Sequence, residues 1–356
     1  MNKILFSIIL ILGTQLYATQ SDQPNSDKIE KKKTFRKEFK VNAQNQLTLR
    51  NQYGDIHITT WDENNISIEV VVTASANDEK AVDRKLEDID VHFSQGSQLV
   101  SAITDISDSN WSFFKNNNVQ FKINYYVKMP IHNLLDVTNE YGFIYLSTLE
   151  GSSKINCEYG GISIESLQND RNDLNLEYCN NSKIQSIHNA HITSDYSTLY
   201  IGSVDNLTLK ADYGHTEIEA VGGLTVEADY GDLKVNNANV IMGDNDYLNF
   251  NIGKINKKLV LDCDYGMIKI NKIAKSFELI DIESSYLNLD LKLEENSNFS
   301  FDIENEYGDI KFNGLNPTYT YKETDGFDKK YQGAVGSKGT AVVKIESEYG
   351  NIEIRN

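Results

Sequence analysis

Residues 207–235 decide the fold of this chain, and they read LTLKADYGHTEIEAVGGLTVEADYGDLKV. The same pattern occurs twice in this stretch, around Tyr213 and Tyr230, with a period of 17 residues. Apolar and polar residues alternate on both sides of each Tyr, which is the pattern of strands with one buried face. A Gly follows each Tyr, where we expect a bend or bulge that restarts the alternation.

The same unit recurs along most of the chain. Its Tyr stands at Tyr53, Tyr141, Tyr159, Tyr178, Tyr196, Tyr213, Tyr230, Tyr247, Tyr265, Tyr286, Tyr307 and Tyr349. From Tyr141 to Tyr307 consecutive Tyr are 17 to 21 residues apart, and the last gap is 42 residues. Apolar residues stand four positions before the Tyr, and three and five positions after it, in nearly every unit. The Tyr178 unit fits this pattern if one residue is inserted between Cys179 and Asn181.

A unit of 17 to 21 residues cannot bury its apolar face alone, whereas stacked units that pair in parallel about 4.8 Å apart can. The sequence therefore predicts an all-β chain that folds as a parallel β-solenoid, and we expect a right-handed β-helix with 17–21 residues per rung. A propeller needs about 40 residues per blade. Sandwich strands pair mostly antiparallel and have no reason to repeat a motif this strictly.

The chain divides into four expected segments. Residues 1–18 form a signal peptide, because Lys3 precedes an apolar run that is too short to span a membrane comfortably. Residues 19–33 are polar and are expected to be a mobile leader. Residues 34–133 form a β-rich N-terminal cap, with one repeat unit and one short helix at 78–88. Residues 134–356 form the solenoid array, with a long loop or hairpin at about 316–340. No later segment looks able to cross a membrane.

The charge and the cysteines exclude several classes of protein. The net charge is −18, from 34 Lys and Arg against 52 Asp and Glu. A phosphate-binding surface needs clustered basic residues, so we expect no nucleic acid partner. Cys157, Cys179 and Cys263 are odd in number and show no CxxC spacing, so neither a disulfide framework nor a cysteine metal site is indicated. We expect three buried thiols.

Three copies of a short motif connect the chain to a known family. They are Tyr53-Gly54-Asp55-Ile56, Tyr307-Gly308-Asp309-Ile310 and Tyr349-Gly350-Asn351-Ile352, and Val127-Lys128-Met129-Pro130 also matches. On these residues the chain resembles the exported bacterial putative-adhesin family of unknown function, over roughly residues 35–356. The resemblance implies a β-solenoid. The resemblance implies little about activity, because the adhesin label of that family is itself an inference. It provides no catalytic residues.

An acidic column precedes the Tyr column. Ten of the twelve repeat Tyr follow an Asp or a Glu, and carboxylates stacked about 5 Å apart repel one another. A row of weak Ca²⁺ sites would compensate for this repulsion, since Ca²⁺ takes several oxygen ligands. The candidate ligands are Glu158, Asp195, Asp212, Asp229, Asp246 and Asp264. The alternative is a solvated acidic edge whose carboxylates accept hydrogen bonds from the backbone.

Two aromatic features are further candidates. The Tyr column is either a strip on which carbohydrate stacks or a packed aromatic ladder, and strand parity places each Tyr inside or at a corner. Trp111, Phe113 and Phe114 form a dense aromatic patch, which is either part of the cap core or an exposed docking site for a partner. His188 and His191 are close in sequence but have no evident metal-binding partners.

These features predict a non-enzymatic, adhesin-like binding or scaffold module of the cell envelope or cell surface. Its partner would be a polysaccharide or an envelope protein, and its location the periplasm or the outer surface. One alternative is a structural or signalling component of the envelope that binds a protein through its cap. A β-helical polysaccharide lyase or hydrolase is a weaker alternative, because it needs cationic residues for substrate carboxylates, and Arg is scarce here. We expect no catalytic residue and no cofactor other than weakly bound Ca²⁺.

Overall fold

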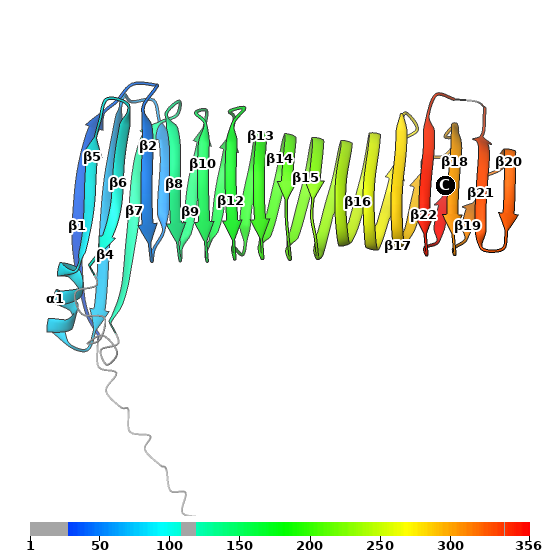
Figure 1. The fold of residues 1–356 in the computed structure, drawn as a ribbon. Helices are drawn as coiled ribbons and strands as arrows, with labels where there is room; N and C mark the ends of the chain where they lie inside the picture. The colour runs from blue at the N-terminus through cyan, green and yellow to red at the C-terminus, as the bar shows by residue number, and fades with distance from the viewer. Residues whose placement is uncertain (1–27, 108–118, 338) are drawn as a thin grey trace, which may run out of the picture.

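The computed structural model describes residues 28–107, 119–337 and 339–356. Within them the chain forms one open sheet of 23 strands and one helix, so the expected all-β class is confirmed. Figure 1 shows the strands following one another along an elongated array, with α1 at one end and β20 at the other. The expected signal peptide, leader residues 19–27 and the aromatic patch at Trp111, Phe113 and Phe114 lie outside the described residues.

The elements follow the chain as three groups. The N-terminal group is β1 (Ile29–Lys40), β2 (Gln46–Gln52), β3 (Ile56–Trp61), β4 (Asn65–Ala76), α1 (Glu79–Glu87), β5 (Ile89–Gln95), β6 (Leu99–Ile106) and β7 (Gln120–Pro130). The central group is β8 (Leu134–Glu140), β9 (Phe143–Leu149), β10 (Ser153–Glu158), β11 (Gly161–Leu167), β12 (Asn172–Glu177), β13 (Ser182–Asp195), β14 (Thr198–Lys210), β15 (His215–Glu227), β16 (Gly231–Ile273) and β17 (Leu279–Leu293). The C-terminal group is β18 (Phe299–Glu306), β19 (Ile310–Asn313), β20 (Pro317–Asp325), β21 (Asp328–Val335), β22 (Val342–Glu348) and β23 (Ile352–Arg355).

Successive units pair in parallel and in register. The strand segments that precede the repeat Tyr pair with one another, and we name this set the leading ladder; for example, Ile155 in β10 lies between Val137 in β8 and Leu174 in β12. The segments that follow the Tyr form the trailing ladder, where Ile164 in β11 pairs with Ile184 in β13. The inserted residue predicted between Cys179 and Asn181 is confirmed by this last pairing.

The predicted apolar columns form the core. The residues four before each Tyr, and three and five after it, are buried along the array, as at Leu209, Leu233 and Val235. Ile310 and Phe312 are half-buried exceptions that still pack against the core. They lie in β19, which among the described strands pairs only with β23, so one side of this strand has no neighbouring rung.

The end of the array departs from chain order. The last rung, β22 and β23, lies between β17 and the earlier rung formed by β18 and β19. Figure 1 shows β22 between β17 and β18. The segment at about 316–340, expected to be a long loop or hairpin, is mostly the hairpin β20–β21, and β21 pairs antiparallel with β18. The hairpin pairs with one edge of β18. After the hairpin, the chain returns as β22, which pairs with the other edge of β18 and with β17.

The N-terminal strands extend both ladders. The unit around Tyr53 is continuous with the array, because β2 pairs with β8 and β3 pairs with β9. The predicted helix is confirmed as α1, whose N-cap Asp78 accepts a hydrogen bond from the Lys80 N–H at 3.1 Å. The predicted leader is wrong at its end: residues 29–33 belong to β1, which pairs antiparallel with β4. Lys and Arg side chains along β1 disfavour the addition of a foreign strand to this edge.

Candidate functional site

The repeat Tyr residues form one continuous stack along the array. Eleven ring-to-ring contacts join the twelve Tyr, with centroids 4.6–5.1 Å apart and interplanar angles of 1–16°. The stack follows the rung order, so Tyr349 lies between Tyr286 and Tyr307. We name this feature the tyrosine ladder. The packed aromatic ladder expected from the sequence is confirmed.

Each ladder Tyr has a left-handed backbone conformation. The twelve φ angles lie between 50° and 61°, a region that costs a residue with a Cβ roughly 1–2 kcal/mol. The Gly after the Tyr was expected to supply this bend, but the Tyr supplies it. The Gly is required for close approach: a Cβ on Gly308 would overlap the carbonyl oxygen of Gly350, and a Cβ on Gly350 would overlap that of Leu287.

Stacking and backbone hydrogen bonds stabilise this turn. Each offset-stacked aromatic pair contributes about 0.5–1.5 kcal/mol beyond its buried area, and most ladder Tyr have two such neighbours. The Tyr213 N–H also donates to the carbonyl oxygen of Asp229 in the next unit at 3.0 Å, and equivalent bonds recur along the array. These contacts offset the cost of the left-handed conformation, so the turn depends on its neighbours.

The ladder exposes ring edges and leaves ring faces covered. The twelve side chains are 39–51% exposed, so the Tyr lies at a corner and not inside. Because adjacent rings are nearly parallel, each face is against the next ring. At the ends, Phe121 contacts Tyr53 and Phe327 stacks on Tyr307, both with centroids 5.3 Å apart. Carbohydrate stacks on aromatic faces, so this geometry does not favour the carbohydrate-stacking strip.

The acidic column compensates for its repulsion through the backbone. The carboxylate of Asp229 accepts a hydrogen bond from the Asp246 N–H at 3.0 Å, that of Asp212 accepts from Asp229 at 3.2 Å, and that of Asp195 accepts from Asp212 at 3.4 Å. Each of these three carboxylates therefore bonds to the backbone of the next rung. This is the backbone-bonded edge that the sequence offered as the alternative to cation sites.

Burial and like charges still act on this column. Desolvation, followed by the neighbouring carboxylates, raises the pKa of Asp246 above its ordinary value. The pKa of Asp212 is raised mainly by desolvation, with the hydrogen bond from the Asp229 N–H acting in the opposite direction. Asp262, two positions before the column, also has a raised pKa, from desolvation and then from Glu283. Ionisation of these three groups therefore destabilises the fold.

The candidate calcium ligands lie in one row but do not converge. Asp195, Asp212, Asp229, Asp246 and Asp264 occupy successive rungs, and the rung of Glu177 separates Glu158 from Asp195. Asp195, Asp212 and Asp229 bond to backbone. Across the described ranges, no group of three or more His, Cys, Asp or Glu side chains could hold a metal ion. Calcium binding by this column stays a proposal. Cys157, Cys179 and Cys263 are buried free thiols, as expected.

A groove lies across the N-terminal ends of the leading-ladder strands, away from the repeat Tyr. It has a volume of about 1110 Å³ and is lined by residues from eight strands, β2, β8, β10 and β12 to β16. Its lining combines amide, hydroxyl and charged side chains, including Asn206, Thr208, Thr225, Lys154 and Asp173, with apolar residues such as Leu134, Ala190, Leu224 and Met242, and apolar atoms provide the larger part of its exposed surface. The groove therefore crosses the strands and could hold an extended chain that has both polar and apolar surface.

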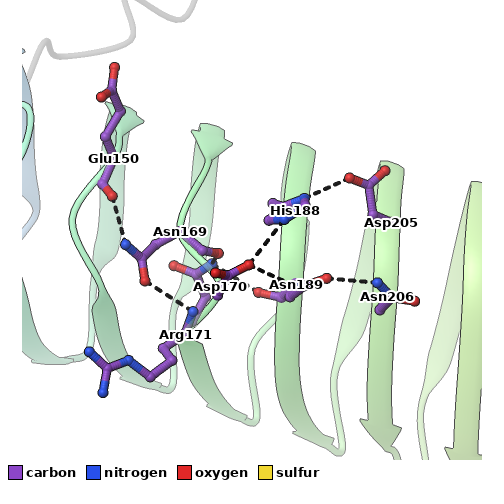
Figure 2. A network of polar contacts seen from close by, with 9 residues as sticks. Glu150, Asn169, Asp170, Arg171, His188, Asn189, Asp205 and Asn206 are labelled. Atoms are coloured by element: carbon purple, nitrogen blue, oxygen red, sulfur yellow. Dashed lines mark hydrogen bonds and ion pairs between the residues drawn. The ribbon is translucent and has the colours of Figure 1, made fainter.

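A network of polar contacts orders the wall of this groove (Figure 2). The imidazole of His188 lies between two carboxylates, with Nδ1 2.6 Å from Asp205 and Nε2 3.1 Å from Asp170. The hydrogen bond with Asp205 is the main cause of the raised pKa of His188. The Asn189 amide donates to Asp170 at 2.9 Å, and the Asn206 amide donates to Asn189 at 2.9 Å. Amides and carboxylates are thus held in place across adjacent units.

The turn before β12 joins the same network. The Asn169 amide donates to the carbonyl oxygen of Glu150 at 2.9 Å, and its oxygen accepts from the Arg171 N–H at 3.1 Å. Sequence reasoning missed the groove and this network. Polar residues seven and five positions before the Tyr, such as Asn189 and His191, were the available signal, but they did not form a strict column.

No family model matches the chain. No curated protein matches it either. Three solved structures are similar over most of their length. A "putative adhesin" from Parabacteroides merdae is 10% identical and covers 90% of this chain and 96% of that chain, with a TM-score of 0.35. A "putative adhesin" from Bacteroides fragilis is 13% identical, with coverages of 91% and 97% and a TM-score of 0.33.

The third is a "putative lipid binding protein" from Parabacteroides distasonis, 9% identical, with coverages of 90% and 96% and a TM-score of 0.34. Two of the three names agree with the resemblance seen in the sequence. Since every TM-score is below 0.5, these similarities carry no argument about function, and membership of the putative-adhesin family stays a prediction.

Proposed function

We propose that this chain is an exported, non-enzymatic, adhesin-like binding module, that its parallel units wind as a β-solenoid, and that its groove binds an extended polysaccharide. The observation that carries the proposal is the groove, which crosses eight strands of the leading ladder. In-register parallel strands repeat every 4.7–4.9 Å, so equivalent backbone positions line the groove at a regular spacing, although the side chains at these positions differ from rung to rung. A polymer with a short repeat can bind to such a series at several points together.

The chemistry of the lining favours a hydroxyl-rich ligand. Side-chain amides and hydroxyls both donate and accept hydrogen bonds. Two lining residues, Asp170 and Asn189, are already hydrogen-bonded to each other, and Asp170 is also held by His188 outside the lining. Side chains that are ordered before binding lose less conformational entropy on binding. The charges in the groove have both signs, which suits a neutral or weakly charged polymer better than a polyanion.

The binding test uses polysaccharide extracted from bacterial envelopes, fractionated by size and immobilised. We expect the full chain to be retained, and the double variant Thr208→Arg, Thr225→Arg to lose at least tenfold in affinity, because both side chains are exposed and line the groove. The matched control is Ser163→Arg with Thr198→Arg, two exposed positions on the trailing ladder, which should bind like the parent. Equal binding by the two variants would refute the groove as the site.

The location is part of the same proposal. Sequencing of the mature N-terminus from the envelope fraction should return a chain that begins near Thr19, and a chain that begins at Met1 would contradict export through a signal peptide. Among the helical residues that the structure describes, none form a helix long and apolar enough to span a membrane. The second candidate, a partner protein bound through the cap, depends on Trp111, Phe113 and Phe114 and stays a prediction.

A further inference from the structure

The tyrosine ladder concentrates oxidisable groups. Twelve of the 20 Tyr in the chain belong to it, and for each of them the neighbouring ladder rings lie 4.6–5.1 Å away in nearly parallel orientation. The side chains are 39–51% exposed, so reagents in solution reach them. Phenols held this close react with one another as in a unimolecular step.

We propose that the ladder is an oxidative cross-linking site, at which a peroxide and a one-electron oxidant of the peroxidase type join neighbouring ladder tyrosines as dityrosine. This modification is independent of the polysaccharide-binding function proposed above. It would fasten adjacent rungs to one another covalently.

The chemistry balances as follows. One electron and the phenolic proton leave each of two neighbouring Tyr, which gives two phenoxyl radicals. The radicals form a carbon–carbon bond between their ortho positions. The two ortho hydrogens then move to the oxygens and restore both phenols. The two electrons and two protons that were removed reduce one hydrogen peroxide to two waters.

The surroundings of the ladder hold protons on phenols until oxidation and place proton acceptors nearby. Desolvation is the main cause of the raised pKa of Tyr159 and Tyr349. The Glu158 carboxylate raises the pKa of Tyr159 further, and the two neighbouring ladder tyrosines, followed by Glu348, raise the pKa of Tyr349 further. These two phenols therefore stay protonated at neutral pH, and each must lose its proton as it loses an electron. The acidic column places carboxylates, which are proton acceptors, beside the ladder along its length.

Two other tyrosines provide an internal control. Tyr126 and Tyr145 are 45% and 38% exposed, which is close to the exposure of the ladder side chains. Each stacks on the imidazole of His57, with ring centroids 5.2 and 4.7 Å apart, so His57 separates them. Tyr126 and Tyr145 are therefore as accessible to the oxidant as the ladder tyrosines, but neither stacks on another phenol. We expect both to stay unlinked.

The rung order predicts which tyrosines link. Tyr349 stacks between Tyr286 and Tyr307, with centroids 4.6 and 4.7 Å from them. Links should therefore join Tyr286 to Tyr349 and Tyr349 to Tyr307. They should not join Tyr286 to Tyr307, although these two are neighbours in the sequence of repeat units. A link between residues so far apart in the chain also restricts the unfolded state, as a disulfide does.

The test treats dilute mature protein with hydrogen peroxide and a haem peroxidase, then digests it and identifies linked peptides by the loss of two hydrogen atoms. We expect intramolecular links between ladder neighbours, at least tenfold more abundant than links to Tyr126 or Tyr145, and a higher Tm for the linked chain. Links between Tyr286 and Tyr307, links spread over all exposed tyrosines, links only between molecules, or no links would each overturn the proposal.

A variant separates cross-linking from folding. Tyr349→Phe keeps a ring in the stack but removes the phenol, so it should fold with unchanged circular dichroism and lose both links to Tyr349. Links between Tyr196 and Tyr213 should persist at the parent yield in this variant. Tyr145→Phe is the matched control and should leave the whole pattern unchanged. Persistence of cross-links at position 349 in the Phe variant would refute the assignment.

Discussion

Replacing Tyr213 tests whether the left-handed turn depends on stacking. Tyr213 has a φ of 54° and stacks on Tyr196 and Tyr230, with centroids 4.9 and 5.0 Å away. Tyr213→Ala removes both stacked contacts but keeps a Cβ in the left-handed region. Tyr213→Gly removes the same contacts and also removes the steric cost of that region. We therefore expect the Gly variant to be the more stable of the two, which reverses the usual order within a strand.

The magnitudes follow from the two contacts and the backbone. Two stacked pairs contribute about 1–3 kcal/mol together, so Tyr213→Ala should be destabilised by at least that amount. Relief of the left-handed conformation is worth roughly 1–2 kcal/mol. The greater freedom of Gly in the unfolded chain costs about 0.4–1 kcal/mol. The free energy of unfolding of the Gly variant should therefore exceed that of the Ala variant by about 0.5–1 kcal/mol.

Thermal melting followed by circular dichroism is the assay, since an array of repeats need not unfold in one step and Tm comparisons require fewer assumptions. Tyr200 is the matched control: it lies in β14 outside the left-handed set, so Ala should be better than Gly there. If Tyr213→Ala melts at or above Tyr213→Gly while the Tyr200 pair behaves normally, the turn is not under the strain inferred here.

Three further predictions concern the core and the acidic column. Ile268→Asp places an unpaired charge at a position that is 1% exposed, so it should cost several kcal/mol and unfold neighbouring rungs; a parental melting temperature would show that the column assignment is wrong. The pKa values of Asp212, Asp246 and Asp262 are raised above 3.8, so the stability that these groups contribute is present below pH 3.8 and is lost as pH rises through the raised values. Replacing the three by Asn should raise Tm at pH 7 relative to the parent, and the difference should shrink as the pH falls towards 3.8; a constant difference across this range would contradict the linkage. If the column binds calcium, millimolar Ca²⁺ must raise Tm beyond NaCl of equal ionic strength, and Asp212→Asn with Asp229→Asn must remove much of that increment; equal melting in the two salts would refute the cation sites.

The sequence by itself determined the repeat, its strands and its buried columns. The strict recurrence of Tyr with apolar residues at fixed offsets, as at Leu209 and Val235, leaves one arrangement in which every unit buries its apolar face against the next. The helix at α1 could also be predicted, because Asp78 is a strong N-cap residue and Val82 and Leu86 share one face. These features depend on residues close together in the sequence, so they can be predicted from each unit or helix segment alone.

Only the tertiary structure decided which units are neighbours at the ends and what the Tyr exposes. Rungs that carry the same motif pair equally well in any order, so the motif could not predict that β22 and β23 lie between β17 and β18. Strand parity allowed Tyr213 to point inward, and the left-handed φ that places it at the corner depends on stacking across rungs. The groove wall likewise depends on contacts between units, such as His188 with Asp205. Side chains that meet only after the units stack leave no pattern within a single unit.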